Sequence, residues 1–278
     1  MALFVAEISW ICRLFDHLFH NRIANISSSY TIQFMKTSLL ALSIISILAL
    51  AGCGNQTIEV DSSHFIKGEE IISFSSIEEM DAIRVSDGYS NGGMFASTWR
   101  KGNLRMEDGI GYLGLEDIDG VNYGTEIRSK QGYLYGYFGA SMKAFKKQGT
   151  VQSLFTYNGG YRRWDEIDIE ILGKDTTKVQ FNYFEDGVGG HEYLHDLGFD
   201  ASLEFHDYGF KWEEEAITWY VDYKPVYRVK ARLTQWGNFF ANVWAGNATA
   251  LSWLGEYEGA SSRLEASYDY LCYAPLQE

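Results

Sequence analysis

Acidic and apolar residues alternate along residues 164–172, Trp-Asp-Glu-Ile-Asp-Ile-Glu-Ile-Leu. A period of two predicts a β-strand, in which Glu166, Asp168 and Glu170 share one face and the intervening isoleucines point into a core. Three carboxyl groups on one face repel each other, which a purely structural strand would avoid. The alternative interpretation is an exposed acidic strand face without chemistry.

Two carboxyl groups on one face are what retaining glycoside hydrolysis requires, one as nucleophile and one as general acid, about 5–5.5 Å apart. The Cα atoms of Glu166 and Glu170 are about 13 Å apart at about 3.3 Å per residue, so their side chains can lean together towards a sugar across the strand. Asp168 between them can hold a proton or hydrogen-bond the nucleophile, which keeps the pKa values of the two glutamates apart. The pattern therefore predicts a catalytic strand.

Short strand-like runs separated by Gly, Asn and Asp recur along the chain after about residue 80. No long helical pattern follows residue 53, although Ser76–Asp81 and Leu251–Tyr257 could each hold a turn of helix. We therefore predict an all-β fold, a jelly-roll sandwich of two stacked antiparallel sheets with a concave substrate groove. The expected strands are Met94–Trp99, Ile110–Leu115, Thr125–Ser129, Leu134–Phe145, Gln152–Tyr157, Glu166–Leu172, Lys178–Phe184, Tyr208–Trp212, Ile217–Val221, Val226–Val229, Phe239–Trp244 and Ala266–Tyr273.

Charge and composition restrict the partners. The formal net charge of −14 argues against nucleic-acid binding, which needs a basic surface, and fits an uncharged glucan. Aromatic residues make up 16% of the chain. Such residues line sugar grooves, but they also fill the cores of β-sandwiches, so composition alone does not decide between these roles.

The N-terminal region has the features of a targeting segment. A basic start at Met35-Lys36 is followed by an apolar run to Leu50 and by small residues, which predicts a signal peptide over residues 35–52. The sequence Leu50-Ala51-Gly52-Cys53 resembles a bacterial lipoprotein box, which implies a diacylglyceryl anchor on Cys53. The protein would then be exported and held at the outer membrane or cell surface. The alternatives are an ordinary secretory signal or a buried apolar helix.

The rest of the chain divides around this segment. Residues 1–34 do not fit a signal peptide, and the simplest hypothesis is a misassigned upstream extension with translation starting at Met35. Residues 53–80 are expected to form a lipid tether and a leading strand, and residues 81–278 a single catalytic domain. Only three cysteines are present, so we expect no intrachain disulfide in this domain.

Residues 164–190 closely resemble the bacterial lichenases, the endo-β-1,3-1,4-glucanases of glycoside hydrolase family sixteen. The resemblance includes Asp-Glu-Ile-Asp-Ile-Glu at 165–170 and Gly-Val-Gly-Gly-His-Glu at 187–192, and it extends over about residues 81–274. It implies a concanavalin-like fold and retaining cleavage of β-1,4 bonds adjacent to β-1,3 bonds in mixed-linkage β-glucan. The alternatives are a laminarinase, a xyloglucan-acting relative, or a glycan-binding lipoprotein without activity.

The resemblance also implies residue roles. Glu166 would be the nucleophile, Glu170 the acid/base and Asp168 an assistant to the nucleophile. No cofactor is needed for catalysis, a structural calcium would be bound near Asp269, and we expect a monomer. The residues implied to bind glucosyl units on the donor side of the groove are Tyr89, Asn91, Glu126, Arg128, Phe155, Tyr157, Trp164, Asn182, Asn242 and Trp244.

Two departures from the family pattern concern stability and specificity. Ser97 and Gly124 occupy the positions of a disulfide that is common in bacillary lichenases. Phe184 stands where those enzymes carry a tyrosine, and the missing hydroxyl is expected to change hydrogen bonding near the cleaved bond.

Overall fold

Antiparallel strands make up most of the described chain. The computed structural model describes residues 65–76, 78–159 and 164–277. Residues 35–52, predicted to be a signal peptide, and Cys53 lie outside these residues, so their predicted roles stay predictions. The strands are β1 (Glu69–Ile72), β2 (Ile83–Val85), β3 (Thr98–Trp99), β4 (Leu104–Glu107), β5 (Ile110–Ile118), β6 (Val121–Tyr133), β7 (Gly136–Lys143), β8 (Thr150–Tyr157), β9 (Glu166–Leu172), β10 (Lys178–Phe184), β11 (Tyr193–Asp196), β12 (His206–Glu213), β13 (Ala216–Val221), β14 (Lys224–Lys230), β15 (Gly237–Ala245) and β16 (Leu264–Ala274).

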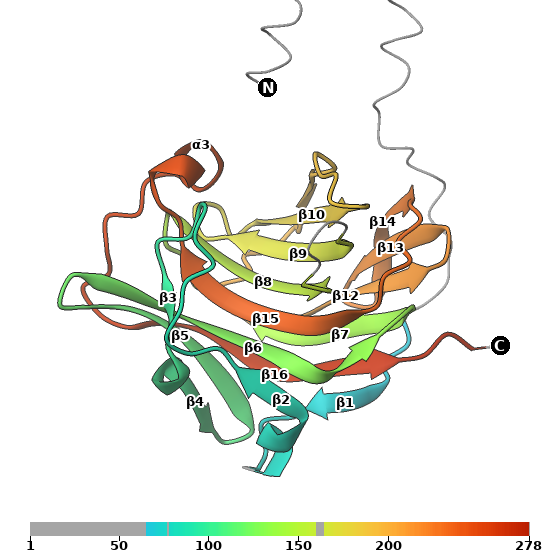
Figure 1. Ribbon diagram of the computed structural model, residues 1–278, viewed down its shortest axis with the longest axis horizontal. Helices are drawn as coiled ribbons and strands as arrows, with labels where there is room; N and C mark the ends of the chain where they lie inside the picture. Colours follow the sequence, from blue (N-terminus) through green and yellow to red (C-terminus); the bar gives the residue numbers. More distant parts are fainter. Residues whose placement is uncertain (1–64, 77, 160–163, 278) are drawn as a thin grey trace, which may run out of the picture. The chain divides into compact units, whose positions relative to one another are not determined.

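The strands form two stacked layers in a jelly-roll arrangement, as predicted. One layer has the order β11-β10-β9-β8-β15-β6, and the other has the order β16-β7-β12-β13-β14. Figure 1 shows β10, β9, β8 and β15 side by side as a curved layer. Strand β5 connects the layers, because its residues 111–115 pair with β16 and its residues 116–118 pair with β6.

The core lies between these layers and is built by alternation. Ile167, Ile169 and Ile171 of β9 are fully buried in one cluster with Phe210 of β12 and Trp219 of β13 from the opposite layer. Because these isoleucines face inward, the carboxylates between them face away from the core. The buried Trp219 indole also donates a hydrogen bond across the core to the backbone carbonyl of Asp168, at 3.1 Å.

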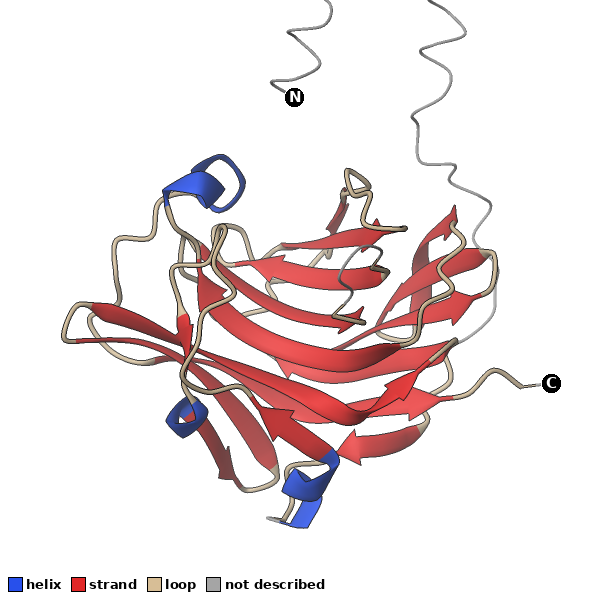
Figure 2. Cartoon of the chain, in the orientation of Figure 1, coloured by secondary structure: helices blue, strands red, loops and turns tan. Residues whose placement is uncertain are grey.

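Among the residues that the structure describes, helical turns lie only in connections between strands (Figure 2). Both expected turns are present, as a 3-10 helix at Glu78–Ala82 and an α-helical turn, α3, at Leu251–Leu254. Further 3-10 turns lie at Lys101–Asn103 and Ala248–Ala250. Along the described part of the chain, no helix has the length and hydrophobicity needed to span a bilayer.

Several strand predictions were wrong in extent; the expected strand Thr125–Ser129, for example, extends over Val121–Tyr133. The expected strand Leu134–Phe145 is interrupted at its start, because Tyr135 and Gly136 have φ of 61° and 120° and form a turn between β6 and β7. The expected strand Met94–Trp99 shortens to Thr98–Trp99, with one isolated bridge from Phe95 to Gly246. Strand β1 lies in the region where a leading strand was expected, whereas the short strands β2, β4 and β11 were not expected.

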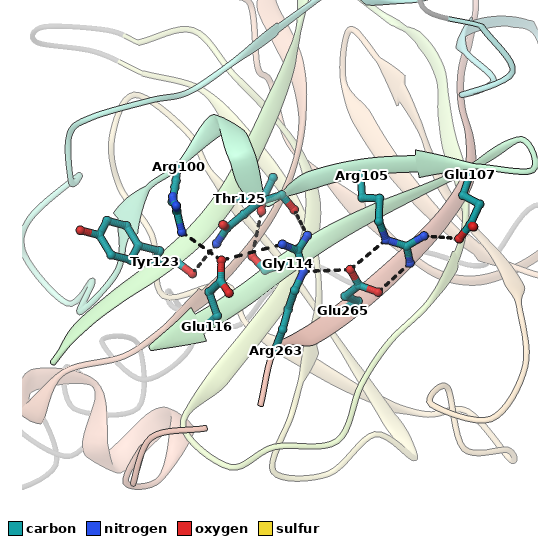
Figure 3. A network of polar contacts seen from close by, with 10 residues as sticks. Arg100, Arg105, Glu107, Gly114, Glu116, Tyr123, Thr125, Arg263 and Glu265 are labelled. Carbon is teal, nitrogen blue, oxygen red and sulfur yellow. Dashed lines mark hydrogen bonds and ion pairs between the residues drawn. The ribbon is translucent and has the colours of Figure 1, made fainter. Parts of the chain in front are cut away.

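A network of charged side chains fastens the point where β5 changes layers (Figure 3). Glu116 of β5 contacts Arg100 at 3.2 Å and Arg263 at 3.8 Å. Arg263 also contacts Glu265, whose other oxygen contacts Arg105 at 2.9 Å. This network lies among β4, β5 and β16, whereas the carboxylates of β9 lie on the other layer, so we assign it a structural role.

Candidate active site

Strand β9 holds its carboxylates in the middle of a regular ladder. Glu166 pairs with Tyr157 of β8 and Phe184 of β10, which are its direct neighbours across the sheet. Asp168 pairs with Phe155 and Asn182 in the same way. The regular register keeps these side chains on the sheet face opposite to the core.

Glu170 completes the row of acids two residues further along β9. It pairs with Ser153 of β8 and Gln180 of β10. Glu170 and Glu166 are both partly exposed, whereas Asp168 between them is buried. Two accessible carboxyl groups therefore flank a third that is shielded from water.

Burial raises the pKa values of all three groups, and repulsion between carboxylates adds to the shift for Asp168 and Glu170. Burial raises the pKa of Glu166 to about 7, although hydrogen bonds with Trp164 and Asp168 favour its ionised form. Burial raises the pKa of Glu170 to about 8, against a favourable hydrogen bond from Gln180. Burial, and then the charges of Glu166 and Glu170, hold the pKa of Asp168 well above its usual range. The hydrogen bond between Asp168 and Glu166 favours the protonated form of Asp168 and the ionised form of Glu166, so Asp168 can act as the donor.

A second pair of side chains orients Glu170. Gln180 Nε2 donates to Glu170 Oε2 at 2.7 Å, and Trp253 Nε1 donates to Gln180 Oε1 at 3.1 Å. The Gln180 amide therefore has one assigned orientation, with its NH₂ group towards the carboxyl. Trp253 and Gln180 also line a cavity of about 170 Å³ together with Leu194 of β11, on the β10 side of β9.

A larger cavity of about 490 Å³ extends from Glu166 across β8, β15 and β6. It contains eight of the ten predicted groove residues, and sequence reasoning missed Phe95, Gly159 and Phe240. Phe240 is two residues before Asn242 on β15, so strand alternation could have found it. The predicted residues that line it are Tyr89, Asn91, Glu126, Arg128, Phe155, Tyr157, Trp164 and Asn242.

Polar side chains in this cavity are fixed by one another. Glu126 accepts hydrogen bonds from Ser86 Oγ at 2.7 Å and from Asn242 Nδ2 at 3.4 Å. Asn242 Oδ1 in turn accepts from Ser153 Oγ at 2.6 Å. Burial raises the pKa of Glu126, while the bonds from Ser86 and Asn242 act in the opposite direction. Such a pre-oriented array suits the hydroxyl groups of a sugar.

Aromatic rings form the apolar part of the cavity. Phe155 and Phe240 stack with ring centroids 4.8 Å apart, and the Arg128 guanidinium lies 5.8 Å from the Phe240 ring centroid. Trp164 lies against Gly187, where an added Cβ would come within 2.7 Å of its ring. Gly187 is therefore required for the position of this indole next to the nucleophile.

The structure places two predicted groove residues outside the larger cavity. Trp244 is only 4% exposed and stacks on Phe95 at 3.9 Å, within a small apolar cluster under α3. The expectation that Trp244 stacks directly on a sugar is thus corrected to a supporting role beneath Phe95. Asn182 is buried beside Asp168, and its Oδ1 has no hydrogen-bond partner among the described residues.

The predicted calcium position has one suitable side chain. Asp269 is exposed at an irregularity of β16, between Tyr268 and Tyr270. Within the described ranges, no group of three or more His, Cys, Asp or Glu residues could hold a metal ion. The described side chains therefore do not by themselves form a calcium site.

A curved β-layer, a row of carboxyl groups with raised pKa values, and a cavity lined by aromatic and amide groups are together typical of a glycoside hydrolase. Residues 91–270 match the description of glycosyl hydrolases family 16. The chain belongs to this family.

Two named relatives, both beta-glucanases, match this chain over 193 residues each. A beta-glucanase of Paenibacillus macerans is 47% identical over 193 residues, which cover 68% of this chain and 81% of the relative. A beta-glucanase of Acetivibrio thermocellus is 45% identical over 193 residues, or 67% of this chain. The chain spans only 57% of the length of that protein.

Solved structures agree with the observed fold. The Bacillus licheniformis beta-glucanase is 38% identical, with a TM-score of 0.70, and the match covers 78% of this chain and all of the other. A prokaryotic beta-1,3-1,4-glucanase (lichenase) from a mouse hindgut metagenome is 41% identical, with a TM-score of 0.69 and coverage of 77% and 100%.

Proposed function

We propose that the chain is a retaining endoglucanase that cleaves β-1,4 bonds adjacent to β-1,3 bonds in mixed-linkage β-glucan. The observation that carries this proposal is the placement of Glu166, Asp168 and Glu170 on one face of β9, beside a groove for sugars. Relatives with 41–47% identity are named beta-glucanase, which supports the substrate class.

The proposed reaction is a double displacement. Ionised Glu166 attacks the anomeric carbon while Glu170 donates its proton to the departing glycosidic oxygen. Glu170 then takes a proton from water, which attacks the glycosyl-enzyme and releases Glu166. Burial raises the pKa values of both glutamates, which suits a proton donor at Glu170, while the hydrogen bonds of Glu166 with Trp164 and Asp168 favour the ionised form that a nucleophile needs. Protonated Asp168 stabilises the nucleophile by donating a hydrogen bond to it.

Product analysis tests the substrate. Barley β-glucan, lichenan, laminarin, xyloglucan and carboxymethylcellulose are compared side by side. We expect tri- and tetrasaccharides with a reducing-end 1,3 linkage from the mixed-linkage glucans. Faster cleavage of laminarin or xyloglucan would favour one of the alternative activities, and binding without cleavage would indicate a glycan-binding protein.

Azide rescue tests the roles. Glu166→Ala is expected to abolish hydrolysis, and azide should restore turnover of an activated aryl glycoside with an α-glycosyl azide as product. Glu204→Ala, at an exposed glutamate, is the matched control. Near-normal turnover by Glu166→Ala would show that the assignment of the nucleophile is wrong.

Export and lipid anchoring are part of the proposal. The support is the sequence Leu50-Ala51-Gly52-Cys53 after an apolar run. Labelling of cells with a radioactive fatty acid should mark the wild-type protein and not Cys53→Ala. We also propose that the protein acts as a monomer, and gel filtration tests this.

A calcium ion near Asp269 has weaker support. Its carboxylate would need backbone carbonyl groups as additional ligands. If such a site exists, EDTA lowers the melting temperature, calcium restores it, and Asp269→Asn removes the response.

A further inference from the structure

Trp236 is a large aromatic side chain that belongs to neither apolar core cluster and does not line the larger cavity. Its indole is 58% exposed, and it directly precedes β15, the strand that carries Phe240 and Asn242. An exposed tryptophan is unusual because its large apolar surface is normally covered. The position of this ring on the sheet indicates what covers it.

The sheet register places Trp236 on the face that carries the catalytic residues. Glu166 pairs with Tyr157, Tyr157 with Asn238 and Asn238 with Gly132, so these four residues form one row across β9, β8, β15 and β6. A Cβ on Gly132 would come within 2.3 Å of the Trp236 six-membered ring. The indole therefore lies over Gly132, at the far end of the row that begins with the nucleophile.

The distance from the nucleophile suits a polymer rather than a single sugar. Gly132 is three strands away from β9, or about 14 Å at about 4.8 Å per strand. The larger cavity lies between them, with Phe155 and Phe240 in its wall. Trp236 thus extends the aromatic surface of the groove beyond the cavity, on the side away from Gln180 and the smaller cavity.

The loop that carries Trp236 is held in place by the catalytic strand. Asp165, next to Glu166 in the sequence, accepts hydrogen bonds from the backbone N–H groups of Thr234 at 2.6 Å and Gln235 at 2.9 Å. Behind the loop, Asn238 Nδ2 donates to the carbonyl of Ser129 at 3.0 Å. The backbone on both sides of Trp236 is therefore fixed before any ligand arrives, which reduces the entropy lost on binding.

We infer that Trp236 is a distal sugar-binding platform, on which a glucosyl unit of the polysaccharide stacks several units away from the cleaved bond. This inference rests on the proposed function, because the same glucan chain must occupy the groove. The exposed ring offers an apolar face on which a sugar can stack. The row of paired residues from Gly132 to Glu166 places this ring and the proposed nucleophile on the same face of the sheet.

Chain-length dependence tests the inference. The kcat/KM values of wild type and Trp236→Ala are measured on mixed-linkage oligosaccharides of increasing length and on an aryl glycoside with a short donor. We expect a threefold to tenfold loss, about the size of one aromatic contact, on long substrates only. Gly132→Ala, which displaces the indole without removing it, should show the same pattern, and Trp236→Tyr should retain most of the activity.

The control is Leu203→Ala, which removes an exposed apolar side chain that does not line the larger cavity. Equal losses on short and long substrates, or no loss in Trp236→Ala, overturn the inference while the proposed function stands. A wild-type protein that cleaves no β-glucan overturns the proposed function, and the inference with it.

Discussion

Replacing the proposed acid by glutamine should make the protein inactive and more stable. Glu170→Gln keeps the shape of the side chain and an oxygen that can accept the Gln180 hydrogen bond, now 2.7 Å long. It cannot donate a proton to a leaving group, so cleavage of β-glucan should stop. The gain in stability follows from the raised pKa of this carboxyl group.

The magnitude follows from linkage between protonation and folding. Burial raises the pKa of Glu170 from 4.5 to about 8 in the folded protein, so folding disfavours its ionised form. The stability of the wild type is therefore full below pH 4.5 and decreases as the pH rises towards 8. At pH 7 the difference corresponds to about 3 kcal/mol, at about 1.4 kcal/mol for each pH unit above 4.5. This value is an upper limit, because Glu170 titrates together with Glu166 and Asp168, and part of its pKa shift belongs to the interaction among the three groups.

Urea unfolding followed by tryptophan fluorescence at pH 7 and pH 4 measures the effect. Glu170→Gln should raise the free energy of unfolding at pH 7 by up to about 3 kcal/mol, and by less than about 0.5 kcal/mol at pH 4. Glu204→Gln, at an exposed position, should change neither value. A variant that gains nothing at pH 7, or gains equally at both pH values, would refute the reasoning, since packing rather than charge would then be responsible.

Three further predictions concern the pH profile and a crosslink. The kcat/KM of the wild type should rise as Glu166 ionises near pH 7 and fall as Glu170 ionises near pH 8; constant activity down to pH 5 would contradict this. In Gln180→Leu, loss of a hydrogen bond that lowers the pKa of Glu170 should move the alkaline limb to higher pH, and an unmoved limb would exclude this role. An added Cβ on Gly124 would lie 3.2 Å from Ser97 Cβ but only 2.4 Å from the Val243 carbonyl oxygen, so the pair Ser97→Cys and Gly124→Cys should form a disulfide whose stabilising effect is reduced by this clash. We expect a gain below about 3 kcal/mol that a reducing agent abolishes, and a free-thiol assay that still finds both thiols would disprove it.

The strand Glu166–Leu172 was predictable because its residue pattern indicates both a secondary structure and a chemical role. Alternation determined the bounds of Glu166–Leu172, and acids on one face indicated the chemistry. The neighbouring strand Lys178–Phe184 was also predicted with the bounds that the structure shows. Both strands lie inside a sheet with one face buried, and such strands show a strong alternation of apolar and polar residues.

The wrong or missing predictions concern residues whose positions depend on tertiary contacts, which the sequence pattern does not specify. Trp244 alternates with Asn242 and shares its face, but α3 and Phe95 cover that end of the strand. The turn at Tyr135 interrupts an otherwise continuous apolar run, and it depends on a positive φ that tyrosine rarely adopts. The position of Trp236 over Gly132 required the register between β6 and β15, which sequence alone does not provide.

The hydrogen bond from Trp219 to the Asp168 carbonyl links the layer that contains β13 to the backbone of the strand that carries the proposed catalytic residues. A shift of the two sheets against each other would move the backbone between the two reacting glutamates. Substitutions far from any sugar, such as changes in the rings packed around this indole, can therefore alter turnover while the protein stays folded. A fluorine-labelled tryptophan at this position would act as an internal probe, reporting by NMR on the catalytic backbone from the side that substrate never reaches.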